Sequence, residues 1–403
     1  AICVKNSHRP LKTVCFFIQI KHLLLNKIYN IGERKMKKEK YNVGIIGATG
    51  MVGQRFITLL HDHPWYNIKV LAASPRSAGK AYKDAVGAKW CMDEEIPASV
   101  ADMVVMNATD DVEKIAKEVD FVFCAVDMKK DEIKALEERY AKAECPVVSN
   151  NSAHRHTPDV PMIIPEINPQ HLEIIPAQKE RLGTKRGFIA VKSNCSLQSY
   201  LPAMAVINMK YPIDHALVTT YQAISGAGKT FETWPEMVDN LIPYIGGEEM
   251  KSEVEPNKVL GKIEGKEIVP SNELSIECQT YRVPVSNGHT AAIFFSFKDG
   301  VNKPSVEEIE KMWADYSGEP QKLNLPHAPK QFIHVYTEKD QPDQPQIKTA
   351  REIDGGMAIS CGRLRESNQY DYKMVSMSHN TLRGAAGGAV LLAELLTAKG
   401  YMD

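Results

Sequence analysis

The sequence predicts an α/β protein that combines a doubly wound parallel sheet with a second domain of the α+β type. In the first half, short apolar runs alternate with amphipathic stretches, as βα units do, and the runs cover residues 43–46, 68–73, 121–126 and 146–149. From about Val191 the pattern changes to longer strand candidates at 276–283, 290–297, 332–336 and 372–377. A chain of 403 residues is also too long for one ordinary core, which favours two domains.

A glycine-rich turn follows the first apolar run and reads Gly47-Ala48-Thr49-Gly50-Met51-Val52-Gly53. Glycines there allow a tight turn and bring the backbone close to a pyrophosphate at the N-terminus of the next helix. The spacing of Phe56, Leu59 and Leu60 predicts that helix. The GxxGxxG spacing departs from the commoner GxGxxG, so an ordinary strand–helix turn stays an open alternative. The dinucleotide hypothesis assigns cofactor contacts to Gly47, Thr49, Gly50, Met51, Val52 and Gly53.

The segment after the second apolar run, residues 74–80, carries hydroxyl groups and cations but no acid. An enzyme that uses NAD commonly places Asp or Glu here on the ribose 2′-hydroxyl, whereas the 2′-phosphate of NADP needs cations and hydroxyl donors. We therefore expect NADP as the cofactor, bound by Ser74, Arg76, Ser77 and Lys80. A solvated basic loop is the alternative interpretation.

Cys195 is the candidate nucleophile. It follows the apolar run 188–191 and precedes the helical pattern of Leu197, Leu201 and Met204, so the sequence places it where a strand passes into a helix. The positive end of a helix dipole would stabilise a thiolate there and lower the thiol pKa. A buried structural cysteine is the alternative, since free cysteine is among the most buried residue types.

A strand-end cysteine downstream of a dinucleotide site suggests an aldehyde or acyl oxidoreductase that works through a thioester and needs an acid/base group. His289 is the candidate for that group, because it stands just before the alternating run 291–297. Arg282, seven residues earlier, could clamp a carboxylate with its planar fork. A packed or surface histidine is the alternative.

These motifs together resemble the aspartate-semialdehyde dehydrogenase family, in its archaeal and fungal branch. The matching segments run from residue 43 to the C-terminus and include GATGMVG, ASPRSAGK, SNNSAHR, SNCS, YQAISGAGK, GGEEMK and NTLRGAAGGAV. Their order and spacing are more specific than any one of them. The resemblance implies a Rossmann-like NADP domain followed by a catalytic and dimerisation domain.

The resemblance also implies roles for individual residues. Cys195 would be the nucleophile, His289 the general acid/base, and Gln222 would position the reacting centre. Arg282 would bind the substrate α-carboxylate, and Glu248 the α-ammonium group, with the adjacent Glu249 as an open alternative. The phosphate would lie against Arg155, Asn194 and Lys251. The cofactor site would be completed by Ser225, Gly226 and Asn380, and Asn380 and the small residues 384–388 would lie against the nicotinamide end of the cofactor.

The reaction implied by the resemblance is the NADPH-dependent, reversible reductive dephosphorylation of L-aspartyl-4-phosphate to L-aspartate 4-semialdehyde. It would proceed through a thioester on Cys195, in the pathway to lysine, threonine and methionine. A malonyl-CoA or succinyl-CoA reductase with the same Cys/His apparatus is the alternative within oxidoreductases, and N-acetyl-glutamyl-phosphate reductase is a weaker one. A non-catalytic NADP-sensing protein is the alternative from another class.

Composition excludes several other classes of protein. The net charge is −1 with no basic stripe, which argues against a nucleic-acid partner. The eight cysteines show no CxxC pairs or metal-ligand spacing, so reduced thiols and no metal are expected. No apolar run is long enough to span a membrane. A cytoplasmic homodimer or homotetramer is the expectation that the family adds.

The expected domain organisation has three parts. Residues 1–35 lack an initiating Met, and their Gly32-Glu33-Arg34 can be encoded by a purine-rich ribosome-binding sequence, so a non-native or disordered leader before Met36 is expected. Residues 36–190 would form the NADP domain, completed by residues 378–403, in which an amphipathic helix is expected over 381–398. Residues 191–377 would form the catalytic and dimerisation domain.

Overall fold

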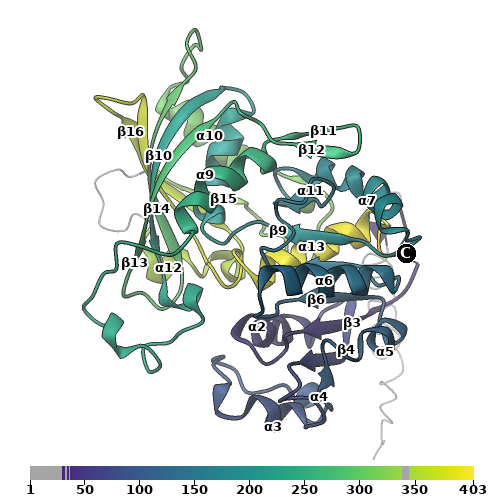
Figure 1. The fold of residues 1–403 in the computed structure, drawn as a ribbon. Helices are drawn as coiled ribbons and strands as arrows, with labels where there is room; N and C mark the ends of the chain where they lie inside the picture. The colour runs from purple at the N-terminus through teal and green to yellow at the C-terminus, as the bar shows by residue number, and fades with distance from the viewer. Residues whose placement is uncertain (1–29, 32–33, 36, 338–344) are drawn as a thin grey trace, which may run out of the picture.

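A computed structural model of the chain describes residues 30–31, 34–35, 37–337 and 345–403. Most of the expected leader therefore lies outside the described residues, and its described pieces form a small antiparallel pair, β1 (Asn30–Ile31) and β2 (Arg34–Lys35). The remaining chain builds two large sheets that lie side by side (Figure 1). Within the described residues, no helix is both long and apolar enough to cross a membrane.

The first sheet is parallel throughout and has the order β5-β4-β3-β6-β7-β9-β8. Its strands are β3 (Tyr41–Ile46), β4 (Tyr66–Ala73), β5 (Met106–Asn107), β6 (Phe121–Cys124), β7 (Val147–Ser149), β8 (Met162–Ile163) and β9 (Ile189–Lys192). The four apolar runs of the first half are all strands, which confirms the predicted doubly wound sheet. The sheet ends at Lys192, two residues beyond the expected boundary at 190; that boundary stays a prediction.

Helices cover both faces of this sheet because its strand residues are apolar on both sides. Phe121 and Phe123 of β6 pack in a core with α2 (Met51–Leu60) and α13 (Ala386–Ala398), whereas Val122 and Cys124 pack on the other face with α6 (Lys130–Lys142). The chain order changes direction between β3 and β6, which are neighbours in the sheet. Ligands of such sheets bind at the carboxyl ends of the strands at this switch point, which is where the glycine-rich turn lies.

Helix α13 differs from its prediction in two ways. It starts at Ala386 rather than near residue 381, because His379 Nδ1 accepts hydrogen bonds from the backbone N–H groups of Thr381 and Leu382, both at 3.2 Å, and fixes a turn. It is also buried on every side from Ala386 to Thr397, not amphipathic. It packs against α2, β7 and β9, so the C-terminal helix lies on the first sheet.

The second sheet is mixed and has the order β13-β10-β14-β17-β16-β15. Its strands are β10 (Ile213–Gln222), β13 (Ser275–Arg282), β14 (His289–Phe297), β15 (Ile333–Tyr336), β16 (Ile359–Glu366) and β17 (Tyr372–Ser378). All four longer strand candidates are confirmed. The sequence prediction missed β10 and β16, although β10 is the strand that joins β13 to β14.

Three helices of eight or more residues cover one face of this sheet. They are α8 (Leu201–Asn208), α9 (Glu248–Val259) and α10 (Val306–Asp315), which contact one another or the strands. Residues of β14 alternate between buried and partly exposed, so the other face is open in the single chain. The remaining elements are short: α3 (Tyr82–Val86), α4 (Ala98–Ala101), α5 (Val112–Glu118), α7 (Ile175–Leu182), α11 (Glu319–Lys322), α12 (Ile347–Ala350), β11 (Lys262–Glu264), β12 (Glu267–Val269), and the 3₁₀ turns η1 (Gly87–Lys89), η2 (Pro169–Ile174), η3 (Leu197–Ser199), η4 (Ile224–Ala227), η5 (Pro235–Met237) and η6 (Ile353–Gly356).

Candidate active site

Strand register brings three of the predicted site residues into one row. Gln222 at the end of β10 pairs with Arg282 of β13 on one side and with His289 of β14 on the other. Residues in register across neighbouring strands point to the same face of a sheet. All three side chains are buried. The row therefore presents a guanidinium, an amide and an imidazole together.

Cys195 faces this row from the loop between β9 and η3. Its Sγ lies 3.5 Å from Nε2 of His289. The backbone N–H of Ala223 donates to the other ring nitrogen, Nδ1, at 3.1 Å, which assigns the proton of the neutral ring to Nε2. Burial first, and the Arg282 guanidinium second, lower the pKa of His289 to about 3. His289 is therefore neutral near pH 7 and points an N–H group at the sulfur.

The environment of Cys195 corrects the helix-dipole prediction. Only the 3₁₀ turn η3 follows directly, and α8 starts at Leu201. The pKa of the Cys195 thiol is raised, by burial first and by the Glu248 carboxylate second, while Lys192, Arg155 and Arg282 oppose the rise. Side-chain cations, rather than a helix N-terminus, are what favour the thiolate.

Two glycines make room for these groups to approach. A Cβ atom at Gly384 would lie 2.9 Å from Cβ of Cys195. A Cβ atom at Gly226 would lie 2.9 Å from Nη1 of Arg282 and 3.2 Å from Cε1 of His289. The two separations of 2.9 Å are shorter than Cβ contacts in real structures, and the one of 3.2 Å is tight, so a larger residue at either glycine would displace the reactive side chains.

A second polar cluster joins α9 to Asn194, the residue before Cys195. Asn194 Nδ2 donates to both carboxylate oxygens of Glu248 at 3.1 and 3.2 Å, and Lys251 Nζ donates to Glu248 Oε1 at 2.6 Å. Burial opposes ionisation of Glu248, but the Lys251 ammonium prevails and lowers its pKa. Glu249 instead accepts from the backbone N–H of Thr280 at 3.2 Å on β13. The geometry therefore separates the two adjacent acids and places Glu248 at the site.

The sequence analysis missed Glu255 of the same helix. Its Oε2 accepts from the backbone N–H of Asn194 at 3.0 Å, and its Oε1 accepts from Nη1 of Arg155 at 3.0 Å. Arg155 Nε also donates to the carbonyl of Lys192 at 3.1 Å, so this guanidinium braces the loop before Cys195. The signal was present, because Glu248, Lys251 and Glu255 have the i, i+3, i+7 spacing of one helix face.

The glycine-rich turn is shaped to admit a ligand backbone. Gly47 has φ +94°, and a Cβ atom there would collide with the Ala125 carbonyl of the neighbouring β6 loop. A Cβ at Gly53 would collide with the Gly47 carbonyl, so α2 packs directly on the turn. Gly50 caps α2, with Thr49, Met51 and Val52 beside it. This cradle of backbone at a helix N-terminus fits a pyrophosphate.

The remaining predicted cofactor residues lie at two places. Ser74, Arg76 and Lys80 are exposed and Ser77 is half-buried, all just after β4, which is next to β3 in the sheet. Asn380 lies at the other place, where its Nδ2 donates to Ser225 Oγ at 2.9 Å and its Oδ1 accepts from the Gly288 N–H at 2.7 Å. The first group lies beyond the carboxyl end of β4, and the second adjoins Gly226 and His289.

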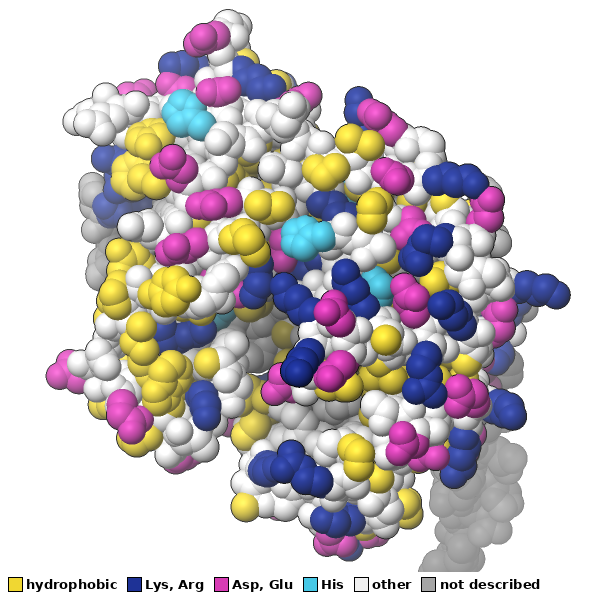
Figure 2. Space-filling view, viewed as in Figure 1, with side chains coloured by type: hydrophobic (Ala, Val, Ile, Leu, Met, Phe, Trp, Pro, Cys, Tyr) yellow, Lys and Arg dark blue, Asp and Glu magenta, His cyan; other side chains and the backbone are white. Residues whose placement is uncertain are grey.

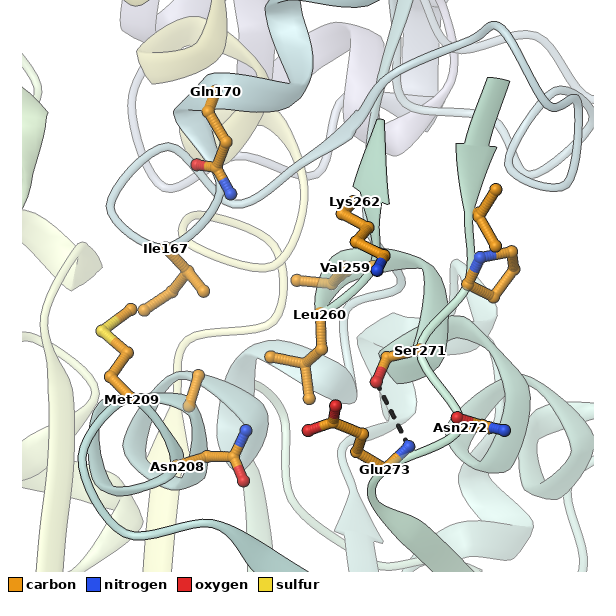
Figure 3. Close-up of a pocket in the computed structure, with 14 residues that line it drawn as sticks. Ile167, Gln170, Asn208, Met209, Val259, Leu260, Lys262, Ser271, Asn272 and Glu273 are labelled. Atoms are coloured by element: carbon orange, nitrogen blue, oxygen red, sulfur yellow. Dashed lines mark hydrogen bonds between the residues drawn. The ribbon is translucent and has the colours of Figure 1, made fainter. Parts of the chain in front are cut away.

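A cavity of about 520 Å³ lies away from this chemistry (Figure 3). It opens between Asn208 and Met209 at the end of α8, Val259 and Leu260 at the end of α9, and Lys262 of the β11–β12 hairpin. Cys195 and Glu248 lie near the opposite, N-terminal ends of these helices. Because a helix rises about 1.5 Å per residue, the length of each helix separates them from the cavity. None of the predicted site residues lines the cavity.

In the described part of the chain, one histidine and carboxylate cluster has a metal-like arrangement: His63, His327 and Glu394. Glu394 Oε1 lies 2.8 Å from His63 Nε2 and 2.6 Å from His327 Nδ1. His63 Nδ1 accepts from the N–H groups of Trp65 and Tyr66 at 3.0 and 3.1 Å, which places its ring proton on Nε2. That nitrogen is a donor to Glu394 and has no lone pair for an ion. The cluster is therefore a hydrogen-bonded clamp on α13.

Comparison with known proteins agrees with the residues and the geometry. The chain matches "Semialdehyde dehydrogenase, NAD binding domain" over residues 42–175 and "Semialdehyde dehydrogenase, dimerisation domain" over residues 204–383. The aspartate-semialdehyde dehydrogenase of Saccharomyces cerevisiae is 43% identical, over 88% of this chain and 97% of that protein. The enzyme of the same name from Methanothermobacter thermautotrophicus is 40% identical, over 88% and 98% of the two chains.

A solved structure extends the match to the fold. The crystal structure of aspartate semialdehyde dehydrogenase with NADP from Candida albicans has a TM-score of 0.80 and 39% identity, over 90% of this chain and 99% of that chain. The resemblance of the motifs is thus confirmed over nearly the whole described chain. The chain belongs to the aspartate-semialdehyde dehydrogenase family.

Proposed function

We propose that the protein catalyses the NADPH-dependent reductive dephosphorylation of L-aspartyl-4-phosphate to L-aspartate 4-semialdehyde, a reversible step toward lysine, threonine and methionine. The observation that carries the proposal is the 3.5 Å approach of Cys195 Sγ to a neutral His289 whose Nε2–H points at it. The names of the relatives and the solved structure with NADP support the same reaction.

The chemistry starts with Cys195. Its thiolate attacks the acyl carbon, the phosphate leaves, and a thioester remains on the sulfur. NADPH, when bound, supplies the hydride that reduces this thioester. The resulting oxyanion re-forms a carbonyl as the Cys195 thiolate leaves, so the reduction itself consumes no net proton. A neutral imidazole can stabilise such an oxygen by donating a hydrogen bond, which is the role we assign to His289.

The charged groups around Cys195 divide between the two ends of the substrate. We assign the α-carboxylate to Arg282, whose planar fork matches a carboxylate, and the α-ammonium group to Glu248. We assign the phosphate to Lys251, Asn194 and Arg155. Arg155 contributes at longer range, because its donors already serve Glu255, Asn150 and Lys192. Gln222, 1% exposed and adjacent to both Arg282 and His289, would orient the acyl group.

An activity assay tests the proposal. The chain should reduce NADP in the presence of aspartate semialdehyde and phosphate, and arsenate should replace phosphate because it also attacks the thioester. Release of aspartate at the same rate without either anion would show hydrolysis rather than phosphorolysis and would contradict the phosphate site. A CoA-dependent reaction, with no response to phosphate, would favour the CoA reductase alternative.

The cofactor preference gives one prediction. Arg76→Ala should raise the Michaelis constant for NADP by about ten- to a hundredfold and leave that for NAD nearly unchanged, since a charge-assisted contact contributes about 1.5–3 kcal/mol and only NADP carries the 2′-phosphate. Lys69→Ala on β4, the strand that precedes Arg76, serves as a matched control for loss of one exposed cation. Steady-state kinetics with both cofactors checks the result. Equal effects on NADP and NAD would place the 2′-phosphate elsewhere.

The division of the substrate site gives a second prediction. Arg282→Leu should raise the Michaelis constant for the semialdehyde by about ten- to a hundredfold, and Lys251→Leu should do so for phosphate, because each loses one charge-assisted contact of about 1.5–3 kcal/mol. Separate Michaelis constants for the two substrates measure this. If both variants weaken phosphate alone, Arg282 does not bind the carboxylate and the division is wrong.

We also propose that the protein is a cytoplasmic homodimer or homotetramer. Hydrophobic side chains gather over the segment between β10 and α9 (Figure 2). The large exposed ones in this segment are Val238, Leu241 and Tyr244, at 61%, 48% and 65% exposure, and Met250 and Val254 of the adjoining helix α9 are 55% and 46% exposed. An apolar patch of this kind, beside an uncovered sheet face, is typical of an interface between subunits. Sedimentation velocity tests this, and a monomer at micromolar concentration would contradict it.

A further inference from the structure

Gln198 is a buried polar residue that the proposed reaction does not use. It lies in η3, three residues after Cys195, and is 2% exposed. Its side-chain Nε2 donates to Ser193 Oγ at 2.7 Å, and its Oε1 accepts from Nε of Arg383 at 3.0 Å. One amide therefore joins Ser193, which stands two residues before Cys195, to Arg383, which stands directly before Gly384.

The orientation of this amide is fixed by its partners. A guanidinium carries only donors, so the atom of Gln198 that faces Arg383 must be the carbonyl oxygen. The amide nitrogen then faces Ser193, whose hydroxyl oxygen accepts. Ser193 is 0% and Arg383 1% exposed, so solvent does not compete for either bond. Both bonds are costly to lose, because a buried polar group without a partner keeps its full desolvation penalty.

Arg383 is held in place independently of Gln198. Its Nη1 and Nη2 donate to the two carboxylate oxygens of Glu166 at 2.7 and 2.5 Å, in a bidentate pair whose side chains are both buried. The guanidinium carbon of Arg383 also lies 4.9 Å from the centroid of the Phe332 ring. Arg383 is therefore a fixed anchor. What Gln198 adds is a bond that ties Ser193 to this anchor.

The two segments that Gln198 joins meet at Cys195. A Cβ atom on Gly384, the residue after Arg383, would lie 2.9 Å from Cβ of Cys195 and 2.6 Å from the carbonyl oxygen of Asn380. Residues 380–388 are those that we assign to the nicotinamide end of the cofactor. Gln198 thus ties the loop of the nucleophile to the segment expected beside the hydride donor, next to the point where the two segments touch.

We propose that Gln198 sets the separation between Cys195 and the nicotinamide end of the cofactor, and thereby controls the rate of hydride transfer rather than the binding of substrate. It is a positioning residue, because it acts through Ser193 and Arg383. Misplacing reacting groups by about 1 Å can slow a reaction about 10²-fold. The inference rests on the proposed function, in which hydride passes between the cofactor and the carbon bonded to the Cys195 sulfur.

Gln198→Met tests this, because methionine keeps the length of the side chain and removes the bonds to Ser193 and Arg383. The single-turnover rate of NADP reduction with aspartate semialdehyde should fall about ten- to a hundredfold, while the Michaelis constants for NADP, semialdehyde and phosphate change by less than about threefold. Ser193→Ala removes only the bond between Ser193 and Gln198, and it should lower the rate in the same way. The double variant should be no slower than Gln198→Met, since both changes break one contact. A wild-type rate in either folded variant overturns the proposal.

Alkylation of Cys195 by iodoacetamide provides a measurement that needs no substrate. Saturating NADP should slow this alkylation in the wild type, followed at the Cys195 peptide by mass spectrometry, because the nicotinamide end would lie beside the sulfur. In Gln198→Met, the rate without NADP should stay close to that of wild type, and the protection by NADP should be several-fold weaker. Absence of protection in the wild type would overturn the proposal and leave the thioester reaction standing. Protection without any reaction of the semialdehyde would instead contradict the proposed function.

Gln178→Met is the matched control. Gln178 lies on α7 at 0% exposure, donates through Nε2 to the carbonyls of Asp159 and Ile189, both at 2.9 Å, and accepts from the N–H of Ile189 at 2.6 Å. The same substitution there should lower the melting temperature at least as much as Gln198→Met does, and should leave the hydride-transfer rate close to wild type. A similar loss of rate in Gln178→Met would overturn the proposal, because general loosening of the core would then account for the effect.

Discussion

Cys195→Ser is expected to lower turnover by several orders of magnitude while leaving the fold and NADP binding intact. A hydroxyl is a far weaker nucleophile than a thiolate at neutral pH, and an oxygen ester would be a poorer hydride acceptor than a thioester. The loop that carries Cys195 does not depend on the sulfur, since Asn194 is held by Glu248 and Glu255. Single-turnover reduction of NADP measures the loss of turnover, and a fluorescence titration with NADPH measures whether cofactor binding is intact.

Cys91→Ser is the control for this result. Cys91 is half-buried in the first domain, bonded through its N–H and Sγ to Oε1 of Gln54, and far along the chain from the reactive row. Its replacement should leave turnover close to wild type. Turnover of Cys195→Ser within tenfold of wild type would remove the thioester from the mechanism.

The parallel sheet could be predicted because its signals are local. Each of its longer strands contains a fully buried run, 43–46, 70–73 and 121–124, as expected of strands buried on both faces, and the glycine turn marks where the first strand ends and α2 begins. The sequence does not predict strand β10 because one of its faces is open. Polar residues such as Asp214, His215 and Thr219 therefore interrupt the apolar pattern. Its identity as a central strand depends on pairing with β13 and β14, which are distant in sequence.

The helix after Cys195 could have been placed better from the sequence. Pro202 cannot donate a backbone hydrogen bond and belongs in the first turn of a helix. It therefore marks a new start at Leu201, and the preceding residues form only the turn η3. The apolar spacing alone predicts a helix that begins at Cys195. In the structure α8 begins at Leu201, so no helix dipole acts at Cys195.

Burial decides the electrostatics of the site, and burial is a property of the fold. The sequence suggests that Cys195 and His289 act together, but desolvation moves the pKa of the thiol up and that of the imidazole down. A raised thiol pKa and a lowered imidazole pKa both disfavour a thiolate–imidazolium pair. Glu255 and Lys192, which share in setting the charge of this region, lie outside the motifs that point to catalysis, so only the three-dimensional arrangement reveals them.

His289 provides the last prediction, because its two ring nitrogens have different tasks. His289→Asn keeps an amide near Nδ1, where it can accept from the Ala223 N–H, but removes the donor at Nε2. His289→Gln places an N–H donor close to the position of Nε2. If the donor acts on the oxygen of the acyl group, kcat should fall about 10²- to 10⁴-fold in the Asn variant and by about tenfold less in the Gln variant.

The pH profile distinguishes this role from that of a titrating base. Since the pKa of His289 is lowered to about 3, the ring stays neutral above that pH, and it loses its neutral form only as pH falls toward 3. The pH profile of the wild-type hydride-transfer rate, measured in single turnovers, should therefore have no acid limb near pH 6.5. In particular, it should have no limb there that is lost in His289→Gln. Such a limb, together with equal losses in the Asn and Gln variants, would mean that His289 gains and loses a proton during the reaction, and the hydrogen-bond assignment from the Ala223 contact would be wrong.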